Sequence, residues 1–214
     1  MSDSFEPIIF IVSGPSGSGK STLVRKLLEL PGTMFSISVT TRPPRANESD
    51  GKWYHFVSDK EFREMVERGE FLEHACVFGR HSYGTPQKWL DEARTRGVDL
   101  VLEIDVQGAE QVRSKLPESV AIFIVPPSRE ELEKRIRARN QDSQDDIGRR
   151  LEQARLEMAR YVDYDYVVIN EDVDRAGEAV RAIAQAARCE TKRNRRRVYQ
   201  ILKSFGGQST HGGF

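Results

Sequence analysis

The chain has 214 residues; 38% are hydrophobic, 31% are charged, and 33 basic against 33 acidic side chains leave a formal net charge of zero. These values predict a globular protein of one or two domains with a buried core and a heavily solvated surface. The zero net charge argues against a global field that would attract nucleic acid or a membrane. The longest apolar runs, residues 8–12 and 120–125, are far shorter than the roughly 20 residues that span a bilayer, so we expect no membrane partner.

The cysteines and the first residues of the chain favour a reducing, cytoplasmic compartment. Cys76 and Cys189 lie far apart and show no spacing typical of a zinc site or a disulfide framework. The first seven residues are acidic and lack the basic and apolar pattern of a secretion signal. We therefore expect a cytoplasmic protein in a reducing environment.

The regular elements alternate along the chain. Four segments rich in valine and isoleucine predict buried parallel strands, at residues 8–13, 98–105, 120–125 and 165–170. Apolar residues at helical spacing predict helices over residues 20–30, 106–116, 128–139 and about 145–161. Ser128 and Glu131 have the spacing of a capping box at the start of the third helix. Strands that alternate with helices are typical of an α/β fold with a mostly parallel sheet.

Residues 36–90 do not follow this alternation. A segment rich in proline, asparagine, aspartate and glycine, residues 40–51, precedes two aromatic stretches. Between those stretches we predict a short helix whose capping box is formed by Ser58 and Glu61. We interpret the region as an inserted, partly antiparallel subdomain.

The strongest local signal is the sequence GPSGSGKS, from Gly14 to Ser21, between a predicted strand and a predicted helix. It has the pattern of a phosphate-binding loop. Gly14, Gly17 and Gly19 let the backbone direct its N–H groups inward, so that a nucleotide phosphate rests on the positive end of the helix. Lys20 would neutralise the β- and γ-phosphates, and the Ser21 hydroxyl would bind magnesium. The alternative is an ordinary Gly/Ser-rich turn, which the strand–loop–helix context disfavours.

Two carboxylates, Glu103 and Asp105, end the second predicted strand and are expected on one face of it. Ligands of open α/β sheets bind beyond the carboxyl ends of the strands. An acid there can organise magnesium or its waters, or accept hydrogen bonds from a substrate. A solvated strand end is the alternative, and the phosphate loop favours the functional interpretation.

Arginines with hydroxyl donors suggest a site for a second phosphate group. Arg42 and Arg45 stand in the turn TTRPPR, and Tyr54 and Tyr83 are hydroxyl donors. Guanidinium forks suit phosphate oxygens, although an isolated pair of this kind would ordinarily be a solvated loop. A carboxylate and hydroxyl groups complement the edge of guanine, which makes a base-recognition set of Glu73, Ser38 and Thr85 conceivable.

A second group of arginines occurs in the third and fourth predicted helices. Arg135 and Arg139 share one face of a helix, and Arg150 lies in the next helix. A movable lid that carries them would supply positive charge to phosphoryl transfer and exclude water. Salt-bridged surface helices are the alternative, because several glutamates lie nearby.

These separated motifs together resemble the guanylate kinase family over residues 6–187. The resemblance rests on VSGPSGSGKST, SVTTRPPR, FLEHA, YGTP, EIDVQGA, FIVPPS, RRL and YVVIN. It implies transfer of the γ-phosphoryl group of ATP to GMP or dGMP in purine nucleotide metabolism, with Mg²⁺ as cofactor. It also implies an α/β fold: a P-loop NTPase-type parallel sheet core (1–37, 96–127 and 160–188), an inserted GMP-binding subdomain (38–95), a helical lid (128–159) and a basic, partly disordered tail (189–214).

The resemblance also implies roles for individual residues. ATP would be bound by Gly14, Pro15, Ser16, Gly17, Ser18, Gly19, Lys20, Ser21, Thr22 and Asn170. GMP would be bound by Ser38, Arg42, Arg45, Tyr54, Glu73, Tyr83, Thr85, Glu103 and Asp105. The catalytic charges would be Lys20, Arg42, Arg135, Arg139 and Arg150. Ser21, and Asp105 through water, would hold the metal.

The sequence departs from the family pattern at three places. Glu103 stands where many relatives have aspartate, Asn140 replaces a frequent glycine of the lid, and the stretch before Tyr83 is one residue longer. Two other classes of protein stay open: a kinase for another small acceptor such as a sugar phosphate, and a non-catalytic scaffold, which the intact loop argues against. For the basic tail, Arg188 to Lys203, a solvated helix end is favoured over a nucleic-acid contact. Monomer and homo-oligomer both stay open.

Overall fold

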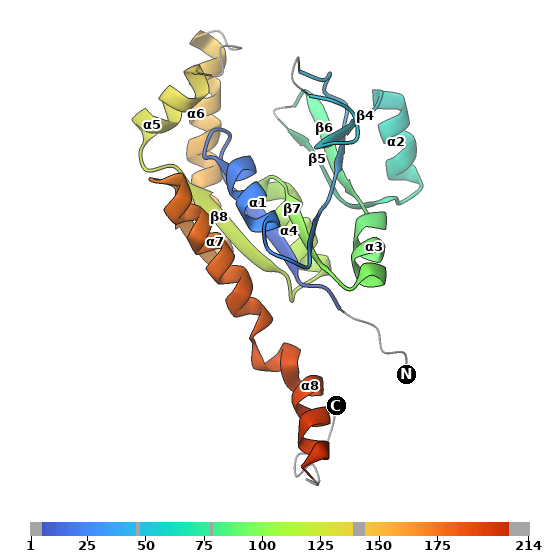
Figure 1. Ribbon diagram of the computed structural model, residues 1–214. Helices are drawn as coiled ribbons and strands as arrows, with labels where there is room; N and C mark the ends of the chain where they lie inside the picture. Colours follow the sequence, from blue (N-terminus) through green and yellow to red (C-terminus); the bar gives the residue numbers. More distant parts are fainter. Residues whose placement is uncertain (1–5, 46–47, 78, 139–143, 206–214) are drawn as a thin grey trace.

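The computed structural model describes residues 6–45, 48–77, 79–138 and 144–205. Its core is a five-stranded parallel sheet with the strand order β2-β7-β1-β8-β9 (Figure 1). The strands are β2 (Thr33–Phe35), β7 (Asp99–Glu103), β1 (Ile9–Ser13), β8 (Val120–Val125) and β9 (Tyr166–Ile169). All neighbouring pairs in this sheet run parallel, which confirms the predicted α/β fold.

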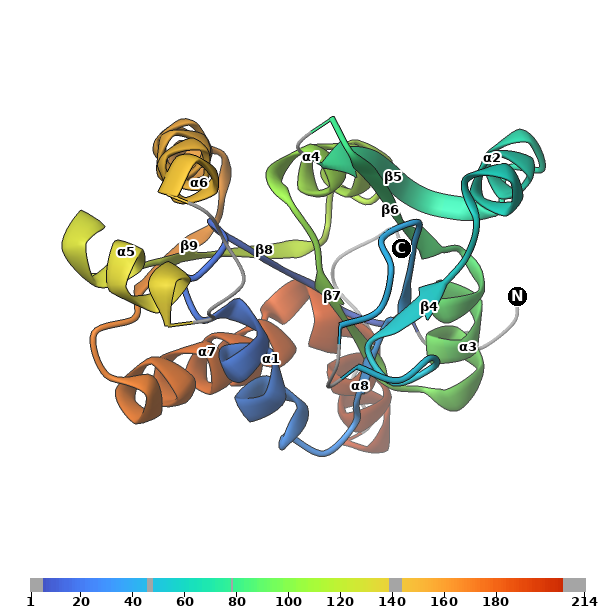
Figure 2. The same cartoon turned by 90° about the horizontal axis from the view of Figure 1, so that it is seen from above.

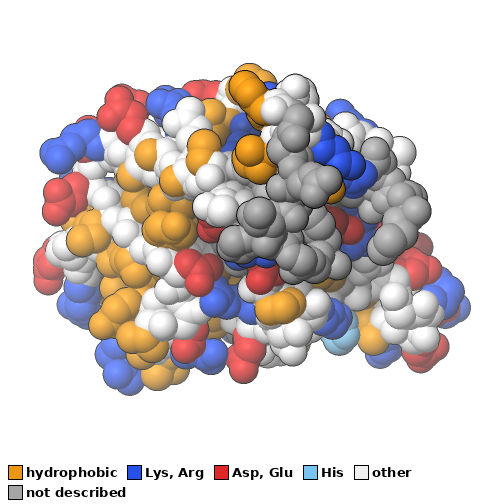
Figure 3. All heavy atoms as spheres, turned by 90° about the horizontal axis from the view of Figure 1, so that it is seen from below, with side chains coloured by type: hydrophobic (Ala, Val, Ile, Leu, Met, Phe, Trp, Pro, Cys, Tyr) orange, Lys and Arg blue, Asp and Glu red, His pale blue; other side chains and the backbone are white. Residues whose placement is uncertain are grey.

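The core sheet differs from the prediction in two respects. β2 was not predicted, because a three-residue strand carries no periodic signal; it forms by pairing with β7. β9 was predicted as a buried strand, and this is wrong: it lies at the edge of the sheet, with Val167 45% and Ile169 57% exposed. Apolar side chains gather in Figure 3 on the side of the molecule where β9 and α7 lie.

Helices cover both faces of the core sheet (Figure 2). They are α1 (Lys20–Leu28) and α7 (Val173–Arg188) on one face, and α3 (Lys88–Arg96) and α4 (Val106–Lys115) on the other. Phe10 and Val12 of β1 face the first pair, whereas Ile9 and Ile11 face the second. This alternation follows from the two-residue period of a strand. Both faces are therefore apolar and buried, as a parallel sheet requires.

The inserted region contains a second sheet of four strands in the order β4-β3-β6-β5. The strands are β3 (Ser38–Thr40), β4 (Tyr54–Phe56), β5 (Phe71–Val77) and β6 (His81–Pro86), and the helix is α2 (Asp59–Glu67). β6 runs antiparallel to β3 and to β5, which confirms the partly antiparallel prediction. The capping box is also confirmed: Ser58 accepts from the Glu61 N–H, and the Glu61 carboxylate accepts from the Ser58 N–H.

Two further helices, α5 (Arg129–Arg137) and α6 (Gln144–Met158), pack together through Leu132, Ile136 and Ala154. A 3-10 helix, Ala159–Asp163, follows. The predicted capping box of α5 is only half formed. Ser128 accepts from the Glu131 N–H at 3.1 Å, but the Glu131 carboxylate pairs with Arg135 instead of the backbone at Ser128. α5 ends at Arg137, and Arg139 and Asn140 lie outside the described residues.

The basic tail forms a helix, α8 (Thr191–Ser204), at the end of the core sheet away from the insertion (Figure 1). Residues 206–214, on which the prediction of disorder falls, lie outside the described part of the chain. Within the described ranges, no helix combines the length and apolar character needed to cross a bilayer.

Candidate active site

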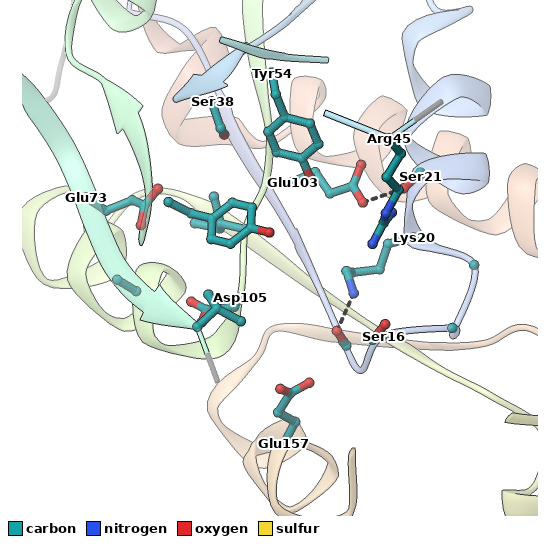
Figure 4. A pocket seen from close by; sticks show the side chains of 17 residues that line it. Ser16, Lys20, Ser21, Ser38, Arg45, Tyr54, Glu73, Glu103, Asp105 and Glu157 are labelled. Carbon is teal, nitrogen blue, oxygen red and sulfur yellow. Dashed lines mark hydrogen bonds between the residues drawn. The ribbon is translucent and has the colours of Figure 1, made fainter. Parts of the chain in front are cut away.

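A cavity opens at the carboxyl ends of β1 and β7, between the core sheet and the inserted sheet (Figure 4). The phosphate loop, the insertion, the end of β7 and α6 each contribute to its wall. The predicted residues that line it are Gly14, Ser16, Gly17, Gly19, Lys20, Ser21, Ser38, Arg45, Tyr54, Glu73, Tyr83, Glu103 and Asp105. The fold thus brings most of the predicted nucleotide-binding residues to one cavity, although they come from segments far apart in the chain.

The phosphate loop needs glycine at the positions where the sequence has it. Gly14 and Gly19 have φ angles of 141° and 96°, a region that side chains disfavour. A Cβ atom on Gly14 would lie 2.2 Å from the carbonyl oxygen of Ile124, and one on Gly19 would lie 2.2 Å from Asn170 Nδ2. The loop is therefore closely packed from behind, and its form is fixed before any ligand binds.

Two side chains stabilise the loop. Lys20 Nζ donates to the carbonyl oxygens of Gly14 and of Pro15, the second at 3.1 Å. Asn170 is 5% exposed, and its Nδ2 donates to the Ser18 carbonyl oxygen at 2.7 Å. In this structure Asn170 supports the loop, a role that sequence reasoning missed; its contact with ATP stays a prediction.

The two carboxylates after β7 have different surroundings. Ser21 Oγ donates to Glu103 Oε1 at 2.6 Å, so Glu103 lies beside the loop. Asp105 is the N-cap of α4 and accepts from the Gly108 N–H at 2.8 Å and from Gln107 Nε2 at 3.2 Å. The predicted common strand face does not hold, because β7 ends at Glu103. Both acids line the cavity, and Glu103 is the one in contact with Ser21.

Glu73 on β5 is a buried acid in the wall of the cavity. Its side chain is 3% exposed and accepts from Thr85 Oγ1 at 2.6 Å. A Cβ atom on Gly108 would lie 2.4 Å from Glu73 Oε2, so glycine at that position makes room for the carboxylate. Burial, with a contribution from the charge of Asp105, raises the pKa of Glu73 to about 7. A carboxyl group held in this way can present an acceptor oxygen to a ligand.

An arginine in the insertion is held by an acid that sequence reasoning missed. Arg42 forms a two-pronged ion pair with Glu48, at 2.9 Å and 3.0 Å, and its Nε donates to the Tyr83 hydroxyl at 3.2 Å. The guanidinium also lies 5.5 Å from the ring centroid of Tyr54. Although burial opposes it, hydrogen bonds from Arg42 and from the Arg45 backbone lower the pKa of Glu48. Glu48 therefore stays charged and fixes Arg42 beside the two tyrosines.

The other predicted residues lie around this cavity rather than in its described wall. Thr85 is buried behind Glu73, and Thr22 is exposed on α1. Arg135 donates to Glu131 at 2.9 Å and to the Asn170 carbonyl oxygen at 3.2 Å. The predicted residues that the structure describes but that do not line the cavity are Pro15, Ser18, Thr22, Arg42, Thr85, Arg135, Arg150 and Asn170. Arg139 lies outside the described ranges.

A further carboxylate, Glu157 of α6, lines the cavity and was not predicted. It is 9% exposed, and burial raises its pKa, an effect that the charge of Lys20 opposes. Figure 4 shows its side chain directed toward the loop. Glu157 directly precedes Met158 of the predicted apolar stripe, a position from which sequence alone does not show that a carboxylate enters the site.

The parallel core with a phosphate loop after its central strand defines the class: a P-loop NTPase fold. The sequence pattern of the family described as guanylate kinase matches residues 6–187. The chain belongs to the guanylate kinase family, and it is a nucleoside monophosphate kinase.

Known guanylate kinases are similar to this chain over nearly its whole length. The guanylate kinase of Escherichia coli strain K12 is 46% identical over 200 residues, which cover 92% of this chain and 96% of that protein. The guanylate kinase of Myxococcus xanthus is 48% identical over 202 residues, covering 94% and 95%. The crystal structure of guanylate kinase from Anaplasma phagocytophilum is similar with a TM-score of 0.77 at 36% identity, covering 95% and 98%.

Proposed function

We propose that the protein transfers the γ-phosphoryl group of ATP to GMP or dGMP, giving ADP and GDP or dGDP. The observation that carries this proposal is a single cavity with the phosphate loop on one side and Ser38, Tyr83 and Glu73 on the other. ATP would place its phosphates on the loop and near Lys20. The acceptor would lie against the inserted sheet.

The acceptor side suits a guanine nucleotide. Guanine presents N1–H and an exocyclic amine as donors, which complement the carboxylate of Glu73. Arg42, Arg45 and the two tyrosines would hold the phosphate group. Burial raises the pKa of Tyr54, so its hydroxyl remains a donor at neutral pH.

The chemistry needs positioning and positive charge more than proton transfer. An oxygen of the GMP phosphate forms the new bond to the γ-phosphorus, the bond from that phosphorus to the β,γ-bridging oxygen breaks, and ADP leaves with the electron pair. The attacking oxygen already carries negative charge, so the step needs no dedicated base. Lys20 and the arginines would neutralise the oxygens of the transition state.

The residues beside the loop fit a magnesium ion. The Ser21 hydroxyl and the Glu103 carboxylate are oxygen donors 2.6 Å apart, and Mg²⁺ prefers oxygen ligands. We propose that Ser21 and Glu103 hold the metal directly or through water, and that Asp105 contributes through water. When bound, the ion would neutralise charge on the β- and γ-phosphates.

An acceptor panel tests the proposed function. ADP release from MgATP is measured with GMP, dGMP, AMP, CMP, UMP and a sugar phosphate. We expect kcat/KM for GMP to exceed that for AMP by at least about a hundredfold. A preference for the sugar phosphate would support the alternative kinase, and no ADP release with any acceptor would support a scaffold. We also propose a cytoplasmic location, which the two free thiols, Cys76 and Cys189, support.

Glu48→Gln is expected to weaken GMP binding. The neutral amide cannot form the two-pronged ion pair, so Arg42 loses the partner that holds it beside Tyr83. We expect KM for GMP to rise about tenfold, with kcat and KM for ATP changed by less than about threefold. Steady-state kinetics checks this, with Glu64→Gln on α2, which removes an exposed ion pair of the same subdomain, as the control. Equal KM values for GMP in the two variants would contradict the role of Glu48.

A further inference from the structure

A second cavity, of about 1050 Å³, lies at the end of the core sheet opposite the phosphate loop. We call it the basal groove. Its walls are the segment before β1, the loop after α1, one side of α3, and the start of β7. The loop after α4, the end of α7 and one face of α8 complete them. Figure 1 shows α8 beyond this end of the sheet, far from the insertion and from α5. The proposed nucleotide-transfer chemistry makes no use of the basal groove.

The basal groove is strongly basic in a chain whose net charge is zero. Seven basic and three acidic side chains are among the described residues that line it. Each of the three acids already has a basic partner in the groove: Glu6 pairs with Arg94, Asp99 with Arg188, and Glu118 with Lys192. Asp91 and Glu190, which lie beside the lining, also pair with Arg94, Lys192 and Arg193. With these two acids counted, positive charge exceeds negative charge by two, a surplus that favours an anion.

The walls of the basal groove are held in place by specific contacts. Arg188 Nε donates to Asp99 Oδ2 at 2.7 Å, and the buried Asp99 accepts from the Ile8 N–H at 2.9 Å through its other oxygen. α8 is fixed to the core through Arg193, which donates to the Glu118 carbonyl oxygen at 2.9 Å. Asn194 donates to the Arg188 carbonyl oxygen at 2.8 Å. The basic face of α8 is thus anchored over the groove.

Two buried donors in the wall of the groove have unmet hydrogen-bonding capacity. Arg94 Nε and Ser119 Oγ are inaccessible to solvent and make no hydrogen bond with the described residues. Both residues line the basal groove. Buried polar atoms are rarely left without a partner, so the wall of the groove holds donors that the described residues do not satisfy.

The lining also restricts the kind of anion. No aromatic side chain is among the described residues that line the groove, and single-stranded nucleic acids bind largely by stacking bases on aromatic rings. Guanidinium and ammonium groups instead match the oxygens of phosphate chains. We propose that the basal groove binds an oligophosphate anion through its phosphate chain, independently of any nucleoside. This site is separate from the phosphate loop.

The test uses the full-length, ¹⁵N-labelled protein and sodium tripolyphosphate at constant ionic strength. The Arg94 Nε–H and Ser119 amide resonances are followed by NMR during the titration. We expect saturable shifts with a Kd below about 1 mM. Arg197→Glu, in the lining, should raise that Kd at least about tenfold, whereas Arg195→Glu, on the same helix but outside the lining, should change it less than about twofold.

Three comparisons complete the experiment. ATP is expected to bind the groove within about tenfold of tripolyphosphate, and orthophosphate and an oligothymidylate more weakly than tripolyphosphate. Both variants should retain phosphoryl transfer to GMP, which reports that they are folded. Shifts that never saturate, or an equal rise of the Kd for tripolyphosphate in the two variants, would indicate only general electrostatic attraction. Either result would overturn the proposal. Tighter binding of the oligothymidylate, equal binding of orthophosphate, or far tighter binding of ATP would overturn the assignment to a phosphate chain.

Discussion

Lys20→Ala is expected to lower kcat for GMP phosphorylation by about a hundredfold to a thousandfold, with the fold intact. The ammonium group lies on the phosphate loop, where its Nζ donates to the Gly14 and Pro15 carbonyl oxygens. These are the oxygens of a loop whose form already depends on its glycines and on Asn170. The lost activity would therefore come from the proposed neutralisation of phosphate charge in the transition state, rather than from the two hydrogen bonds that Lys20 gives the loop. ADP-release kinetics and a thermal unfolding curve check the two parts of this expectation.

Lys26→Ala is the matched control for Lys20→Ala. Lys26 lies on the same helix, α1, but pairs with the exposed Asp174 at 3.1 Å on the side away from the cavity. We expect the control to keep kcat within about twofold, because exposed ion pairs contribute little. If kcat of Lys20→Ala stays within about tenfold of kcat of the unchanged protein, the proposed catalytic role of Lys20 is contradicted.

Glu73→Gln is expected to lower the preference for GMP over AMP by about tenfold to a hundredfold. The carboxylate can accept from both guanine donors, whereas the amide offers one acceptor and places donors against the other guanine hydrogen. Thr85 fixes the orientation of the side chain in either case. The ratio of kcat/KM for the two nucleotides measures the effect. An unchanged ratio would exclude Glu73 from base recognition.

The raised pKa of Glu73 adds a pH dependence to this prediction. Since that pKa is about 7, the carboxyl group takes up its proton as pH falls below 7, and KM for GMP should then rise. The folded protein holds this proton up to a higher pH than the unfolded chain, so the buried charge weakens the fold as pH rises toward 7. Glu73→Gln removes both effects. KM for GMP should vary less between pH 6 and 8 in the variant than in the unchanged protein, and at pH 8 the variant should be at least as stable as the unchanged protein. Glu70→Gln, an exposed acid paired with Arg68, is the control.

The elements of the core were predicted well where the signal is local. The four predicted core strands and the helices α1, α4, α5 and α6 recur within a few residues, because apolar runs and helical spacing reflect the burial of each segment. β2 is too short for such a signal, and β9 has the apolar composition of a buried strand although it lies at an edge. α7 was missed even though Ala176, Val180 and Ala184 form a visible stripe.

The site was predicted unevenly for a physical reason. The phosphate loop is contiguous, so its residues and their order specify its form. The contacts that organise the rest join distant positions: Ser21 with Glu103 and Asn170 with the Ser18 backbone are 82 and 152 residues apart. Sequence reasoning identified most of these residues but not their partners. It missed Glu48 and Glu157 entirely, because an acid in a loop or on a helix carries no local sign of its neighbour.

The transfer itself is tested most directly by following the phosphorus atom. ATP labelled with ³²P at the γ-position is incubated with the protein, magnesium and GMP, and the products are separated. We expect the label to be recovered in the β-phosphate of GDP, in an amount equal to the ADP formed. Label recovered as inorganic phosphate, with GMP left unchanged, would contradict it.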